Sequence, residues 1–66
     1  MRYYRDSQHM YPESTAMWRL NDDGSVDYRN DNEDEWEPAF VLTSLDLLED
    51  SLFQGNIEEY YPTQGM

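Results

Sequence analysis

The sequence predicts an α+β fold in which a small antiparallel β-meander carries one α-helix packed on a face. Two observations lead to this prediction. Residues 15–30 alternate apolar and polar side chains on both sides of a turn that contains Asp-Gly, which is typical of a β-hairpin. Residues 43–54 instead repeat leucines at helical spacing, and Gly55 follows where a helix C-cap glycine belongs.

The side chains of the hairpin also predict its register. A two-residue turn would pair apolar residues with charged ones on each face of the hairpin. A three-residue loop over residues 22–24, with Gly24 left-handed, avoids this mixing, because a slip of one residue exchanges the two faces of a strand. The pairs expected in this register are Leu20 with Val26, Trp18 with Tyr28 and, on the other face, Arg19 with Asp27.

Two further extended segments are expected outside the hairpin. A third strand is predicted near residues 35–42, with Trp36 facing the core. The apolar run at residues 40–42 is compatible with the end of this strand or with a longer helix that starts near Pro38. A last extended segment is expected over residues 57–61.

The helix is expected over residues 43–54, with Thr43 as its N-cap. Thr43 and Ser44 are better caps than interior helix residues, and this favours the shorter helix over the longer one. The apolar stripe of the helix faces the sheet and completes the core. The expected core consists of Trp18, Leu20, Val26, Tyr28, Leu45, Leu48, Leu52 and Phe53.

The chain divides into one small acidic domain, residues 15–61, and two flexible ends. Residues 1–14 show no sustained periodicity, and Pro12 interrupts any strand there. This N-terminal arm is compatible with disorder or with an edge segment packed through its tyrosines. Residues 62–66 are expected to form a frayed tail.

Composition limits what so short a chain can be. A chain of 66 residues forms one domain at most and buries about 60% of the surface that its unfolded form exposes. A net charge of −11 opposes folding, whereas an aromatic content of 15% favours a packed middle. The chain has no cysteine, so a cytoplasmic location is expected. No apolar run approaches the roughly 20 residues of a membrane span.

The charges are unevenly distributed along the chain. All four arginines precede residue 30, and no Lys or Arg follows it. Such a surface repels nucleic acid and anionic membranes and attracts basic protein surfaces. The ten carboxylates of the second half are Asp31, Glu33, Asp34, Glu35, Glu37, Asp46, Glu49, Asp50, Glu58 and Glu59.

The sequence contains few residues of the types that catalysis and metal binding need. With no Cys, no Lys and a single histidine, His9, in the N-terminal arm, the chain lacks an activated nucleophile with its base, and no enzyme activity is expected. An EF-hand alignment on Gly24 places Arg19 and Asn30 at the first and last ligand positions, so the motif fails. No cofactor and no metal are expected.

The remaining function is binding to another protein through the acidic residues. Trp36 lies within a run of carboxylates, an arrangement that suits a desolvated anchor with an acidic rim. The same stretch is also compatible with a solvated loop without a binding role. The residues expected to bind the partner are Asp31, Glu33, Asp34, Glu35, Trp36, Glu37, Asp46, Glu49 and Asp50.

In size, charge and compactness the chain resembles the small acidic inhibitors that phages encode against host polymerases, restriction systems or CRISPR effectors. The resemblance implies a decoy that imitates nucleic acid and occupies a basic surface of a nucleic-acid-handling partner. An adaptor or assembly subunit that docks through its hairpin edge or helix is the alternative, with the charge serving solubility. A homo-oligomer that covers its aromatic side chains is a further alternative.

Overall fold

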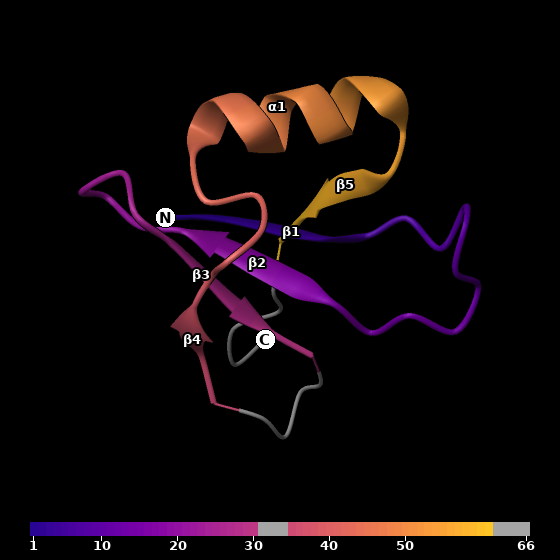
Figure 1. Cartoon of the computed structure of the whole chain (residues 1–66), viewed down its shortest axis with the longest axis horizontal. Helices are drawn as coiled ribbons and strands as arrows, with labels where there is room; N and C mark the ends of the chain where they lie inside the picture. Colours follow the sequence, from indigo (N-terminus) through magenta and orange to yellow (C-terminus); the bar gives the residue numbers. More distant parts are fainter. Residues whose placement is uncertain (31–34, 62–66) are drawn as a thin grey trace.

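The chain folds into one antiparallel sheet covered on one face by a helix (Figure 1). The computed structural model describes residues 1–30 and 35–61. Within them the sheet has five strands in the order β4-β3-β2-β1-β5, which confirms the α+β meander. The elements are β1 (Arg2–Asp6), β2 (Met17–Leu20), β3 (Val26–Arg29), β4 (Glu37–Pro38), α1 (Leu45–Gln54) and β5 (Ile57–Tyr60).

Strands β1 to β4 follow one another as neighbours, and α1 then carries the chain back across the sheet. Because β4 and β5 are the two edge strands, the helix must cross one face between them. Figure 1 shows α1 lying over the sheet, with β5 returning beside β1. Among the described residues, no helix has the length and apolar character needed to cross a bilayer.

The predicted hairpin register is confirmed at every pair. Leu20 lies opposite Val26, Trp18 opposite Tyr28, and Arg19 opposite Asp27. Gly24 has a φ of 92°, which is the left-handed conformation that the three-residue loop requires. Its backbone N–H donates a hydrogen bond to the carbonyl of Asn21 at 3.0 Å, and this bond closes the turn.

The N-terminal segment differs from both alternatives expected for it. Residues 2–6 form β1, which pairs with β2 on one side and with β5 on the other, so the strand is internal to the sheet. Tyr4 at its centre is fully buried, with 0% of its surface exposed. The division at residue 15 therefore does not separate an arm from the sheet.

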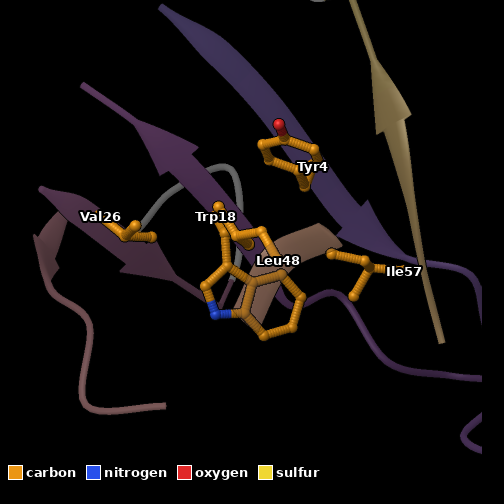
Figure 2. Packing of buried hydrophobic residues seen from close by; sticks show 5 residues of the cluster. All are labelled: Tyr4, Trp18, Val26, Leu48 and Ile57. Atoms are coloured by element: carbon orange, nitrogen blue, oxygen red, sulfur yellow. The ribbon is translucent and has the colours of Figure 1, made fainter. Parts of the chain in front are cut away.

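Five side chains from four strands and the helix form the core, and Figure 2 shows them converging. Leu48 supplies the helix side and is fully buried. The prediction that Phe53 belongs to this core was wrong, because 91% of its surface is exposed. Leu45 is also exposed, at 36%. The core residues are Tyr4, Trp18, Val26, Leu48 and Ile57, and partly buried Ala16, Leu20, Tyr28, Ala39, Leu42 and Leu52 pack against them.

The helix begins at Leu45, two residues after the start of the predicted range, and ends at Gln54 as expected. Ser44, not Thr43, is the N-cap, and its hydroxyl accepts a hydrogen bond from the backbone N–H of Leu47. Gly55 adopts the left-handed conformation with a φ of 81° and closes the C-terminus. The apolar run at residues 40–42 forms neither strand nor helix, because β4 stops at Pro38.

Candidate functional site

The side of the sheet away from α1 carries an arginine and aromatic cluster. Side chains alternate between the two faces of a strand. Trp18 and Tyr28 point toward the helix and pack in or against the core, so Arg19 and Arg29 point to the open face. Three of the four arginines lie on this face, since Arg5 alternates with buried Tyr4.

Trp36 lies on this open face and not in the core, so the expectation that it faces inward was wrong. Its ring is contacted by the guanidinium groups of Arg19 and Arg29, each with Cζ 4.6 Å from the ring centroid. The ring of Tyr3 lies 6.1 Å from it. The two cation–π contacts come from β2 and β3 and the ring contact comes from β1, so Trp36 connects the β4 side of the sheet to all three strands.

Carboxylates of the described residues form ion pairs with three of the four arginines. Arg19 donates to Asp27 at 2.6 Å in a pair that is about four-fifths buried, with side-chain exposures of 22% and 21%. This hydrogen bond, supported by one from Asn21, lowers the pKa of Asp27. On the β1 side Arg5 pairs with Glu58 at 2.6 Å and Arg2 pairs with Glu59 at 3.4 Å.

The predicted binding carboxylates fall into two separate places. Asp46, Glu49 and Asp50 lie on α1, whereas Glu35 and Glu37 lie at the β4 edge, on the opposite side of the view in Figure 1. All five are exposed, and none forms a salt bridge within residues 1–30 and 35–61. Asp31, Glu33 and Asp34 lie outside the described residues.

Phe53 lies with the helix carboxylates on the outward side of α1 and not in the core. We call Asp46, Glu49, Asp50 and Phe53 the outer helix face. Phe53 follows Leu48 by five residues, which places it about 140° around the helix from that buried side chain. The angular position of Phe53 relative to Leu48 therefore predicts an exposed side chain, which the apolar character of Phe53 alone does not.

A surface hollow of about 400 Å³ lies beside the loop that joins β1 to β2. Its lining contains Ser7, Ser14 and Thr15, but His9 is not part of it. Arg5 in its wall is already paired with Glu58. The hydroxyls of Ser7 and Thr15 donate to the backbone carbonyls of Gly55 and Asn30, not to a carboxylate. The described residues contain no group of three or more metal-ligating side chains.

No protein-family model matches the chain, and neither curated proteins nor solved structures show a significant similarity to it.

Proposed function

We propose that this protein is a non-catalytic, acidic binding protein that occupies a basic surface of a nucleic-acid-handling partner, as an inhibitor or nucleic-acid-mimicking decoy. It acts in the cytoplasm, where such partners are accessible to it. The docking surface is the line of helix carboxylates Asp46, Glu49 and Asp50, and the exposed carboxylates Glu35 and Glu37 at the β4 edge extend the negative field.

The observation that carries this proposal is the difference between the arginines, which have partners within the sheet, and the helix carboxylates, which form no salt bridge within the described residues. Arg2, Arg5 and Arg19 are paired with carboxylates inside the sheet, and Arg29 is stacked on Trp36. Arg2 also interacts electrostatically with Glu49 of α1, but no arginine forms a salt bridge with a helix carboxylate among the described residues. A net charge of −11 also exceeds the magnitude of roughly 2–8 that solubility needs in a small domain. Its self-repulsion is relieved when a basic partner binds.

One observation favours a second candidate, an adaptor or assembly subunit that docks through the helix layer. Several large apolar side chains between β4 and the end of α1 are exposed and do not belong to the core, although the ring of Phe40 contacts that of Tyr28 at 6.2 Å. In that case apolar contact drives binding, and the charge serves solubility. These exposed residues are Phe40, Val41, Leu45, Leu47 and Phe53.

A competition experiment separates the two candidates. The immobilised protein is incubated with a lysate of the cells that express it, and bound proteins are eluted in parallel by salt and by duplex DNA. For a decoy, both should release the same nucleic-acid-handling protein, because DNA and the decoy share one basic groove. A bound protein that resists both salt and DNA would contradict the decoy and favour the adaptor.

Matched charge variants then locate the surface on the purified partner. Glu49→Gln removes one charge from the outer helix face, and Glu13→Gln removes one exposed charge elsewhere; neither carboxylate forms a salt bridge within the described residues. The helix variant should slow association several-fold at low salt, since rim charges act mainly on encounter. Equal effects of the two variants would mean that net charge alone, and not the helix, drives binding.

A further inference from the structure

Phe53 is the most exposed large apolar side chain of the described residues, with 91% of its surface open to solvent. It adds nothing to the core, which closes over Leu48 and Leu52 on the other side of α1. It also lies in the last turn of a helix whose end is already capped by Gly55. Its aromatic ring is therefore not explained by folding or by capping.

The surroundings of Phe53 are acidic. Glu49 and Asp50 precede it by four and three residues, and side chains at these spacings are neighbours on a helix, with Cβ atoms about 5–6 Å apart. Asp46 lies one further turn along the same side. Asp50 accepts a hydrogen bond from Gln54 at 2.8 Å, and none of the three carboxylates has a salt bridge within the described parts of the chain.

An exposed aromatic ring among carboxylates limits the kinds of partner surface that can bind it. A second copy of the chain would bring like charges together across the contact, and a nucleic acid or an anionic membrane would be repelled. A basic protein surface compensates the carboxylates, but charge alone does not desolvate the ring. An apolar pocket rimmed by Lys or Arg removes the ring from water and pairs the neighbouring carboxylates with positive charges.

We infer that Phe53 is the anchor of the outer helix face and inserts into an apolar pocket with a basic rim on the partner protein. This inference rests on the proposed function for the sign of the partner's charge, and it adds the residue that holds the complex together. The mode is that of an amphipathic helix docking into a groove, with one aromatic side chain contributing most of the affinity.

The decisive variant is Phe53→Ala, with Tyr11→Ala as the matched control. Both side chains are exposed aromatics, so neither variant should change the melting temperature appreciably. Loss of a hot-spot anchor weakens binding by about thirty-fold or more. Phe53→Ala should therefore raise the dissociation rate by that factor on the partner released by salt and DNA, while Tyr11→Ala leaves it unchanged.

Site-specific crosslinking tests the contact without requiring a purified partner. Phe53→p-benzoylphenylalanine is irradiated in the lysate beside the same replacement at Tyr11, and the crosslinked proteins are identified by mass spectrometry. A crosslink from position 53 alone to a protein with a basic surface supports the inference. A crosslink to a second copy, to an acidic protein, or to nothing overturns it.

The two proposals fail in different ways. If Phe53→Ala leaves the dissociation rate unchanged while DNA still competes, the anchor is wrong and the decoy stands. If Phe53→Ala disrupts a complex with a basic pocket that DNA does not displace, the anchor stands and the decoy is wrong.

Discussion

The face of the sheet under α1 and the open face are held by different interactions. Under the helix, Tyr4, Trp18 and Leu48 are buried in a small apolar core. On the open face no helix of residues 1–30 and 35–61 covers the sheet, and Trp36 lies against the guanidinium groups of Arg19 and Arg29. One face is stabilised by removing apolar surface from water, and the other by cation–π contacts and ion pairs.

This difference explains how so acidic a chain folds without a large core. Arg5, Arg19 and Arg29 stabilise the sheet from the open face, on the side away from α1. Arg2 is the exception, because it lies over the Tyr4 ring on the covered face. The carboxylates of α1 then remain uncompensated by salt bridges within the described residues. The distribution of charge between the two sides is thus a consequence of how the sheet is stabilised.

The largest effect is expected on the covered face. Leu48→Ala removes a fully buried side chain from the centre of the core, and such truncations reduce the free energy of unfolding by about 2–5 kcal/mol. Leu47→Ala, on the adjacent exposed position, should cost less than about 1 kcal/mol. Urea unfolding followed by circular dichroism measures both, and similar losses for the two variants would contradict the assigned inward face of α1.

Trp36→Ala tests the open face. Two desolvated cation–π contacts are each worth about 0.5–2 kcal/mol, so we expect a loss of about 1–3 kcal/mol in the free energy of unfolding. Unfolding curves measure it, with Tyr11→Ala as a control for loss of an exposed aromatic ring. An unchanged free energy of unfolding would show that Trp36 does not stabilise the sheet. It would favour the alternative that Trp36 contacts a partner protein.

The hairpin could be predicted from the sequence because its information is local. Alternation of side chains, the Asp-Gly turn and the need for one apolar face together specified the pairing of Trp18 with Tyr28 and the left-handed Gly24. The C-cap at Gly55 was predictable for the same reason. Each of these features depends on residues within a few positions of one another, and each is confirmed.

Features that depend on distant residues could not be predicted in the same way. Strand β1 is stabilised by partners far along the chain, including Glu58 and Glu59, so residues 1–14 carried no local sign of it. Trp36 was assigned by its carboxylate neighbours in sequence, whereas two arginines from β2 and β3 determine its position. The exposed carboxylates of the helix could be predicted from the sequence. The exposure of Phe53 could be predicted only from the direction in which each side chain leaves the helix.

A smaller effect is expected from the ion pair on the open face. The folded-state pKa of Asp27 is lowered by its hydrogen bond from Arg19, so the pair's contribution to stability is present above about pH 4. It is lost as the pH falls through the lowered folded-state pKa. Asp27→Asn should cost about 1 kcal/mol at pH 7 and flatten the acid limb of the stability curve. Glu13→Gln is the control, and an unaltered acid limb in the Asp27 variant would show that the pair does not couple folding to pH.

The smallest effect is expected from Tyr4→Phe, on the covered face. The Tyr4 hydroxyl is buried and has no hydrogen-bond partner among residues 1–30 and 35–61, so its removal relieves a desolvated polar group and retains the ring beneath Arg2. Stability at pH 7 should be unchanged or rise by up to about 1 kcal/mol. Burial raises the folded-state pKa of Tyr4 above its ordinary value near 10, so the wild type should lose stability as the pH rises beyond that value. Tyr4→Phe should remove this alkaline loss, whereas Tyr11→Phe, at an exposed position, should retain it. A clear loss of stability at pH 7 would mean that the hydroxyl does have a partner, and that the covered face, like the open one, depends on a polar contact.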